Sequence, residues 1–382
     1  MQITSRLPKV GTTIFTVMSQ LAARHGALNL GQGFPDFDVP GFLVEGMARA
    51  MREGHNQYAM GNGIAPLRQA IAAKTLDVYG RRIDPDTDVT VTSGASEAIL
   101  DAVLALVHPG EEVIVLDPCY DCYEPAIEMA GGIAVHLPLD PETFAVDWDR
   151  VRDAITPKTR MLFINSPHNP SGATLTAADL DALAAIVRDT RVIVLSDEVY
   201  EHIVHDGRQH ESVLRHPELA ERSVVVSSFG KTYHCTGWKV GYAVAPPALS
   251  AELRKVHQYN TFCTMHAAQW AFAAAITEHP DHHRGLGAFY QPKRDHFQRL
   301  LAGTKFRALP VPGGYFQLVD YSAVSDLPDH EFARWLTIEH GVTGVPLSPF
   351  YAEAPADQRL LRLCFAKDEG TLERAVERLA AL

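Results

Sequence analysis

Short β-branched runs alternate with longer helix-like stretches through much of the chain, and this alternation limits the folds open to it. Five runs predict buried strands: Asp88–Thr92, Glu112–Leu116, Met161–Asn165, Val192–Ser196 and Val224–Ser227. Helix-like stretches lie between them, among them Ser96–Val107 and Leu175–Asp189, where Thr176 is a suitable N-cap. Such alternation is typical of an α/β fold with a mainly parallel sheet covered on both faces.

Polar or turn-forming residues follow each of the predicted strands. These segments begin at Ser93, Asp117, Ser166, Asp197 and Ser228. In open parallel sheets, ligands bind at the carboxyl ends of the strands. We therefore expect the segments to contribute to one shared site.

The C-terminal part of the chain has a different pattern. Helix-like stretches Pro292–Leu301 and Asp329–His340 accompany a short strand candidate, Tyr315–Asp320. A chain of 382 residues is long enough for two domains. We predict an N-terminal arm and part of a small α+β domain at 1–44, a large ligand-binding domain at 45–287, and the small C-terminal domain at 288–382.

The charge, the cysteine number and the lack of long apolar runs exclude several classes of protein. Asp and Glu number 46 against 34 Lys and Arg, a net charge of −12, so the chain lacks the basic surface of a nucleic-acid or membrane binder. The five cysteines are odd in number and mostly widely spaced, which favours a reducing compartment over a disulfide framework. No apolar run approaches the ~18 residues of a membrane span. We expect a soluble, cytoplasmic protein.

Lys231 stands in a turn directly after a predicted strand, within Ser-Ser-Phe-Gly-Lys-Thr. Taken alone, it is most simply a surface lysine. Gly230-Lys231-Thr232 also matches the end of a nucleotide-binding loop, but that motif requires glycine at 225, where the chain has Val225. The chemically more specific interpretation is an imine-forming lysine.

The sequence around Lys231, SSFGKTYHCTGWKVGY, resembles the cofactor-lysine motif of class I/II pyridoxal-phosphate (PLP) aminotransferases. Five further blocks match in family order: NLGQGFPDF, NQYA, SPHNPSG, SDEVYEH and LLRLCFAKDE, so that the resemblance extends from residue 29 to residue 369. Leu7–Ala22 and Lys255–Gln269 resemble the kynurenine and methionine aminotransferase branch, in particular bacterial methionine aminotransferases. The resemblance implies the fold type I, aspartate aminotransferase-like architecture, with PLP as cofactor.

The resemblance also implies catalytic roles. Lys231 would bind the cofactor covalently and then, as a free amine, move a proton between two carbon atoms. Asp197 would keep the pyridine nitrogen protonated, although a carboxylate after a strand is also a common helix cap. Tyr200 and Asn169 would hydrogen-bond the phenolic oxygen of the ring, and Asn169-Pro170 is equally ordinary turn chemistry.

A second set of residues is implied to hold the cofactor phosphate. Gly94, Ala95 and Ser96 open a helix after a strand, where backbone N–H groups attract anions. Ser228 and Lys239 would add side-chain contacts, and Tyr58 would reach the phosphate of a neighbouring subunit, so that the enzyme would be a homodimer. Lys239 stands where many relatives have arginine, and Gly230 where serine is common.

Three further residues are implied, one at the cofactor ring and two at the substrate carboxylate. Tyr120 aligns with an aromatic residue that stacks on the cofactor ring, although a core tyrosine is the simpler alternative. Arg362 lies in an apolar strand-like run, where an unpaired charge is costly, and would bind the substrate α-carboxylate together with Asn169. Gly33 would add a backbone donor to the same carboxylate.

Several other patterns are discounted. Cys119 and Cys122 form C-x-x-C without a second pair, and Gly31-x-Gly33 lacks the third glycine of a dinucleotide fingerprint. His202, His205 and the pair His282-His283 show no metal-ligand spacing and are expected to be surface residues or satisfied core residues. We therefore predict no metal site. Trp270–Ile276 is expected to form a buried helix.

The resulting prediction is a ping-pong aminotransferase that moves an amino group from an L-amino acid to a 2-oxo acid. Methionine is the favoured donor, with aromatic amino acids, glutamine or kynurenine as further donors. Apolar and aromatic candidates near the site support this choice: Phe15, Phe34, Tyr58, Phe262 and Phe350. A PLP-dependent cysteine-conjugate β-lyase is the alternative. A cofactor-binding DNA regulator fits poorly, because only 28 residues precede the first matching block.

Overall fold

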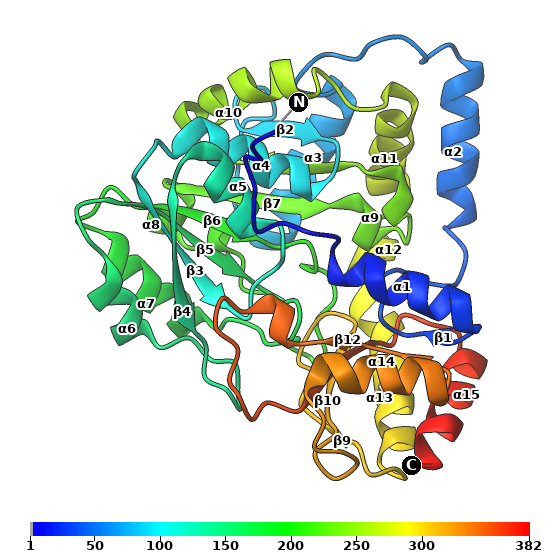
Figure 1. Cartoon of the computed structure of the whole chain (residues 1–382). Helices are drawn as coiled ribbons and strands as arrows, with labels where there is room; N and C mark the ends of the chain where they lie inside the picture. Colours follow the sequence, from blue (N-terminus) through cyan, green and yellow to red (C-terminus); the bar gives the residue numbers. More distant parts are fainter. Residues whose placement is uncertain (1–2) are drawn as a thin grey trace.

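A seven-stranded sheet forms the centre of the larger part of the molecule. The computed structural model describes residues 3–382 (Figure 1). The strand order is β2-β8-β7-β6-β5-β3-β4. The strands are β2 (Val89–Thr92), β3 (Glu112–Asp117), β4 (Ile133–Pro138), β5 (Thr159–Asn165), β6 (Ile193–Asp197), β7 (Ser223–Ser228) and β8 (Gly241–Val244). All five predicted strands are therefore present: four agree within one residue at both ends, and β5 begins two residues earlier than expected.

One strand of this sheet runs against the others. β8 pairs antiparallel with both β7 and β2, while the pairings of β3 through β7 are parallel. The sequence analysis did not identify β8 or β4. β8 is only four residues long and includes Gly241, so its local pattern is weak. Because β8 runs antiparallel to β7, the segment that connects them lies beside the start of α4. This segment contains Lys231.

Helices cover both faces of the sheet, as predicted. Alternate residues of one strand belong to different cores: Ile114 packs in one cluster, and Val113 and Val115 in another. The helices of this part are α2 (Gly41–Arg52), α3 (Ala65–Tyr79), α4 (Ala95–Leu106), α5 (Tyr123–Ala130), α6 (Trp148–Ala154), α7 (Ala177–Val187), α8 (Pro217–Ala220), α9 (Phe229–Thr232), α10 (Pro247–Asn260), α11 (His266–Glu278) and α12 (Pro280–Arg284). α11 contains the expected buried helix Trp270–Ile276.

The cap of α7 follows from local chemistry. The Thr176 hydroxyl accepts the Asp179 N–H, and the Asp179 carboxylate accepts the Thr176 N–H in return. This capping box satisfies two N-terminal amides of the helix. The N-cap predicted at Thr176 is thus confirmed.

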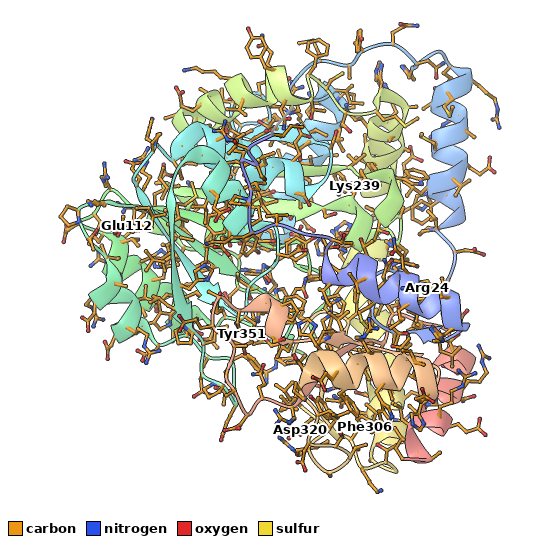
Figure 2. The ribbon with its side chains drawn as sticks, viewed as in Figure 1. Arg24, Glu112, Lys239, Phe306, Asp320 and Tyr351 are labelled. Atoms are coloured by element: carbon orange, nitrogen blue, oxygen red, sulfur yellow. The ribbon has the colours of Figure 1, made fainter. Side chains whose placement is uncertain are left out.

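The smaller part is built on a four-stranded antiparallel sheet with the order β12-β13-β10-β9. It contains β9 (Arg307–Ala308), β10 (Phe316–Asp320), β11 (Val342–Thr343), β12 (Val345–Pro346), β13 (Leu360–Cys364), α13 (Leu286–Leu301), α14 (Asp329–Glu339) and α15 (Glu369–Ala380). Figure 2 shows Phe306 and Asp320 in this part, well separated from Glu112 in the large sheet.

The N-terminal segment joins the smaller part. β1 (Leu28–Asn29) pairs in parallel with β11, and α1 (Ile14–His25) lies against α14 in Figure 1. Met18 and Leu21 of α1 share one core with Phe297 and Leu336. The domain limits of 1–44, 45–287 and 288–382 remain a prediction, and residues 1–2 lie outside the described chain. The boundaries at 44/45 and 287/288 fall inside α2 (Gly41–Arg52) and α13 (Leu286–Leu301).

The start of α13 differs from the prediction. The helix begins at Leu286, and Pro292 lies inside it. Proline normally interrupts a helix because it lacks an N–H and crowds the preceding turn. Here Leu286 and Tyr290 are almost fully buried, so packing holds the first turns despite the proline.

Among the described residues, no helix combines the length and the apolar character needed to cross a membrane.

Candidate active site

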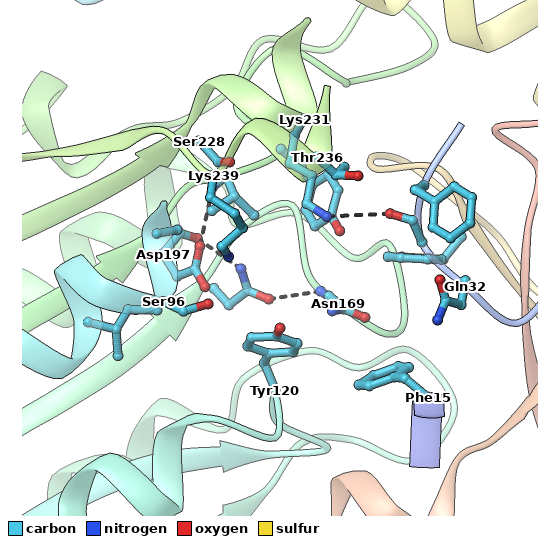
Figure 3. Close-up of a pocket in the computed structure, with 18 of the residues that line it drawn as sticks. Phe15, Gln32, Ser96, Tyr120, Asn169, Asp197, Ser228, Lys231, Thr236 and Lys239 are labelled. Atoms are coloured by element: carbon cyan, nitrogen blue, oxygen red, sulfur yellow. Dashed lines mark hydrogen bonds between the residues drawn. The ribbon is translucent and has the colours of Figure 1, made fainter. Parts of the chain in front are cut away.

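A cavity of about 240 Å³ opens at the carboxyl ends of β5, β6 and β7 (Figure 3). Its walls include residues from segments far apart in the sequence. Eleven of the predicted site residues line it: Gly33, Ala95, Ser96, Tyr120, Asn169, Asp197, Tyr200, Ser228, Lys231, Lys239 and Arg362. The polar strand ends therefore do meet at one place, as expected for this sheet topology.

Lys231 projects from the short helix α9, directly after β7. Among the described residues, its amine donates only to the Gly33 carbonyl, at 3.4 Å. Burial lowers the pKa of Lys231 to about 8, and the charges of Arg362 and Lys239 act in the same direction. At mildly alkaline pH, Lys231 is therefore a neutral amine in a large fraction of the protein molecules, and the neutral amine is the form that attacks a carbonyl carbon.

Gly230 has a steric reason in this structure. A Cβ at this position would lie 3.0 Å from the Thr236 Cα and 3.4 Å from the Ser228 Oγ. The serine common in relatives would crowd this turn. A side chain at this position would require one of these neighbours to shift by a few tenths of an ångström.

Asp197 ends β6 and is buried beside the cavity. The Tyr123 hydroxyl donates to its Oδ2 at 2.7 Å, and the Val199 N–H donates to its Oδ1 at 3.3 Å. Burial raises the pKa of Asp197 to about 6, while the hydrogen bond from Tyr123 opposes that rise. Asp197 is therefore mostly ionised at neutral pH and can hold a cationic partner.

A chain of hydrogen bonds links Asp197 to Arg362. Asn165 Nδ2 donates to the Asp197 carbonyl at 2.8 Å, and Asn165 Oδ1 accepts the Asn169 N–H at 2.8 Å. Arg362 Nη1 then donates to Asn169 Oδ1 at 2.7 Å. Figure 3 shows Asn169 between the Asp197 side of the cavity and the side with Phe15 and Gln32.

Arg362 is 1% exposed, yet it is incompletely satisfied. Its Nη2 donates to the Gly31 carbonyl at 2.8 Å, and its guanidinium lies 4.0 Å from the centre of the Phe316 ring. Its Nε is buried without a hydrogen-bond partner among the described residues. A buried guanidinium with a free donor is suited to a carboxylate.

Two tyrosines shape the walls around the lysine. Tyr200 is 3% exposed, and the centre of its ring lies 5.7 Å from Lys231 Nζ. Burial raises the pKa of Tyr200, so its hydroxyl remains a donor at neutral pH. Tyr120 borders the cavity from the loop after β3, where its ring centre lies 6.0 Å from that of Tyr123.

One end of the cavity is suited to an anion. Ala95 and Ser96 present the N-terminus of the twelve-residue helix α4, close to Ser228 and Lys239. Gly94 does not line the cavity but forms the turn before α4 with a φ of +84°. A Cβ on Gly94 would lie 3.1 Å from Lys239 Nζ, so glycine allows that amine to approach.

Some functional residues escaped the sequence analysis. Tyr123, which donates to Asp197, and Asn165, which orients Asn169, gave no local signal beyond their places near strand ends. Thr236 and Gln32 line the cavity and lie within the matched sequence blocks, which could have suggested them.

Tyr58 lies outside the cavity of its own chain. It is 82% exposed and packs edge-on against Phe262, with ring centres 5.2 Å apart. Phe15 and Phe34 line the cavity, and Phe350 packs against Phe15. The aromatic residues expected near the site therefore form two groups. Phe15, Phe34 and Phe350 lie at or next to the cavity, whereas Tyr58 and Phe262 are exposed.

The discounted histidines are mostly in the core. His205 and His282 each bond a backbone carbonyl, at 2.9 Å and 2.8 Å. His202 lies against Glu201, with 3.7 Å between its Nε2 and the Glu201 Oε1. His283 corrects the prediction, because it is buried and neither ring nitrogen has a partner among the described residues. Burial lowers the pKa of His283 to about 4 and keeps the ring neutral.

The chain is similar in sequence and in structure to known proteins. Residues 26–379 match the family described as aminotransferase class I and II. The methionine aminotransferase of Escherichia coli (strain K12) is 52% identical over 99% of this chain and 98% of its own length. A crystal structure of an Escherichia coli protein with methionine aminotransferase function superposes with a TM-score of 0.98, covering all of both chains.

Two other relatives are more distant. A probable N-succinyldiaminopimelate aminotransferase of Mycobacterium tuberculosis (strain ATCC 25618 / H37Rv) is 41% identical over 99% of this chain and 98% of its own. Human kynurenine–oxoglutarate transaminase 1 is 34% identical over 94% of this chain and 93% of its own.

Proposed function

The chain belongs to the class I and II aminotransferases, and we propose that it is a PLP-dependent homodimer that transfers the amino group of methionine to a 2-oxo acid. The observation that carries the proposal is the convergence of Lys231, Asp197 and Arg362 on one cavity. Bound there, PLP would supply an electrophilic carbon and an electron-withdrawing ring that takes up an amino group and passes it on.

The residues present fit that cofactor. The Lys231 amine has only a long contact to a carbonyl, and the orphaned Nε of Arg362 faces no partner among the described residues. Asp197 would hold the ring nitrogen, and Asn169 and Tyr200 would hold the phenolic oxygen. The N-terminus of α4, with Ser228 and Lys239, would hold the phosphate.

The chain's own groups account for the proton and substrate steps. Lys231, neutral above its lowered pKa, can accept a proton from the substrate α-carbon and return it elsewhere. Arg362 would bind the α-carboxylate by two donors, and the Gly33 backbone would lie beside it. The partner substrate, a 2-oxo acid, has the same carboxylate and would use the same contacts in the second half of the ping-pong cycle.

The choice of methionine has support from the cavity wall. Phe15, Phe34 and Phe316 present apolar surface, and among the described residues lining the cavity Arg362 is the sole arginine. An acidic side chain would thus lack a second arginine, whereas a thioether packs well against aromatic rings. Aromatic amino acids, glutamine and kynurenine stay on the donor panel, as does N-succinyldiaminopimelate. None of the relatives named above is described as a lyase.

The homodimer accounts for an exposed apolar surface. Tyr58 is 82% exposed and packs against Phe262. Within three residues of one or the other along the chain, further large side chains are exposed: Met60, Tyr259 and Met265. In a dimer, this surface would be covered, and Tyr58 would reach the phosphate held by the neighbouring copy. The five cysteines are free, in accord with the reducing cytoplasm expected from the sequence.

The test is a spectrum of the protein with PLP, followed by methionine without acceptor. We expect a visible absorption band that methionine removes and a 2-oxo acid restores, and borohydride should fix PLP on Lys231. Lys231→Ala is the control, which should bind PLP without covalent attachment. A band that methionine leaves unchanged while aspartate removes it would refute the proposed donor.

A further inference from the structure

His257, on α10, lies outside the cavity and is 1% exposed. Its Nδ1 lies 2.7 Å from Glu97 Oε1, and its Nε2 lies 2.7 Å from the Gly61 carbonyl oxygen. A carbonyl oxygen only accepts, and an ionised carboxylate only accepts, so both ring nitrogens must donate. A neutral imidazole has one N–H, and the ring is therefore an imidazolium.

The charges around the ring agree with that state. Burial disfavours the cation, but hydrogen bonds to Asp101 and Glu97 outweigh it and raise the pKa of His257 to about 10. Burial likewise opposes ionisation of Glu97, yet the bonds from His257 and the Ser93 amide hold the pKa of that carboxyl below its ordinary value. These ligating atoms could also surround a metal ion, but both ring nitrogens are already engaged.

The cluster of His257, Glu97 and Asp101 is connected through Glu97 to the end of the cavity that is suited to an anion. Glu97 is in the first turn of α4, and its second carboxylate oxygen accepts the Ser93 N–H. Ser93 and Gly94 form the turn that aims the N-terminus of α4 at the cavity. The His257–Glu97 pair thus fixes the turn from behind without touching the cavity itself.

The same cluster is connected through His257 to the exposed loop that includes Tyr58. Gly61 lies three residues after Tyr58, and its carbonyl is held by His257 Nε2. The same loop rests on Phe262, two residues beyond the end of α10. In the proposed dimer, this loop enters the site of the neighbouring copy.

We propose that His257 is a positioning residue for two cofactor phosphates, fixing the α4 turn in its own subunit and the Tyr58 loop that this subunit lends to its partner. The inference rests on the proposed PLP-dependent dimer. It goes beyond that function because each phosphate would then depend on one imidazolium from each subunit.

The first test compares ligands with and without the phosphate. Apoprotein carrying His257→Gln, whose side chain can donate to only one of the two acceptors in the native geometry, is titrated with PLP and with pyridoxal by fluorescence quenching. We expect PLP affinity to fall about tenfold or more and pyridoxal affinity to change less than about twofold. His205→Gln is the matched control, since it is also a buried histidine bonded to a carbonyl, and should change neither value.

Equal losses for both ligands, or an unchanged PLP affinity, would overturn the assignment. Glu97→Gln provides a second variant in case His257→Gln folds poorly, with the same phosphate-dependent pattern expected at smaller size. If the unaltered protein is monomeric, or binds PLP no better than pyridoxal, the proposed function itself fails, and this inference falls with it.

The second test uses hybrid dimers in which one subunit is marked by Lys231→Ala, so that a single site attaches PLP covalently. His257→Gln is placed either on the subunit with Lys231 or on the marked subunit. We expect faster PLP release in both arrangements than in the hybrid with two His257 residues. A change in the first arrangement alone would refute the lending of the Tyr58 loop.

Discussion

Two lysines surrounded by protein have opposite chemistry in this molecule. Lys74, on α3, donates to Glu201 Oε2 at 2.8 Å and to the Tyr242 hydroxyl at 2.7 Å. Burial alone would lower its pKa, but Glu201 and Tyr242 raise it above the ordinary value. Within residues 3–382, Lys231 Nζ hydrogen-bonds only the Gly33 carbonyl, at 3.4 Å, and its pKa is lowered to about 8.

The difference shows that burial by itself does not make a lysine reactive. A buried lysine with a carboxylate partner stays charged and acts as a structural cation. A lysine denied that partner loses its proton more easily and becomes a nucleophile or a base. Exchanging or removing these partners therefore tests the assignment of Lys231.

The largest expected effect is loss of the Lys231 amine. In Lys231→Ala, the first half-reaction with methionine should slow by about a thousandfold or more, because the proton carrier is gone. Stopped-flow absorbance of the PLP-loaded protein measures this rate. Lys74→Ala, in folded preparations, should retain covalent PLP attachment; loss of attachment there would break the comparison.

The next effect concerns stability. Lys74→Met leaves Glu201 buried without its cation, and this should cost about 3–5 kcal/mol of unfolding free energy. Urea denaturation of the apoprotein measures it. The double variant Lys74→Met/Glu201→Gln should recover much of the loss, since no unpaired charge remains. A cost for Lys74→Met under about 1 kcal/mol, typical of an exposed pair, would show that the Lys74–Glu201 pair is unimportant.

The third prediction concerns a variant in which Lys231 gains a carboxylate neighbour, as Lys74 has in the unaltered protein. In the unaltered apoprotein, the rate of covalent PLP attachment should rise with pH through about 8, because only the neutral amine attacks. Cys364 is a close buried neighbour of Lys231. Cys364→Asp should raise the lysine pKa and move the rise to higher pH by about one unit or more. Cys364→Ser is the control and should leave the midpoint in place.

The smallest effect lies at Asp197. Tyr123→Phe removes the donor to Asp197 Oδ2, so the pKa of Asp197 should rise further above its ordinary range. The expected loss in PLP affinity of the apoprotein is about 1 kcal/mol, growing as the pH falls toward 6 and Asp197 takes up its proton. Isothermal titration between pH 6 and 8 checks this. An affinity loss that is the same at every pH would separate Tyr123 from the ionisation of Asp197.

Local sequence patterns account for most of the fold around the site. The five strands, the Thr176 cap and the polar strand ends were each predicted from patterns within a few residues. β8 was missed because its four residues include Gly241 and give a weak local pattern. The start of α13 was missed because buried contacts, distant in sequence, retain Pro292 inside a helix.

The sequence by itself determined which residues are proposed to carry the chemistry, because their types and their order along the chain match a family and follow predicted strands. Only the tertiary structure decided their state. Arg362 meets Asn169 across 193 positions, and His257 meets Glu97 across 160. Lys231 lacks a carboxylate partner that Lys74 has. Ionisation depends on which groups lie within a few ångströms and on how far water is excluded, and chain neighbours do not specify either.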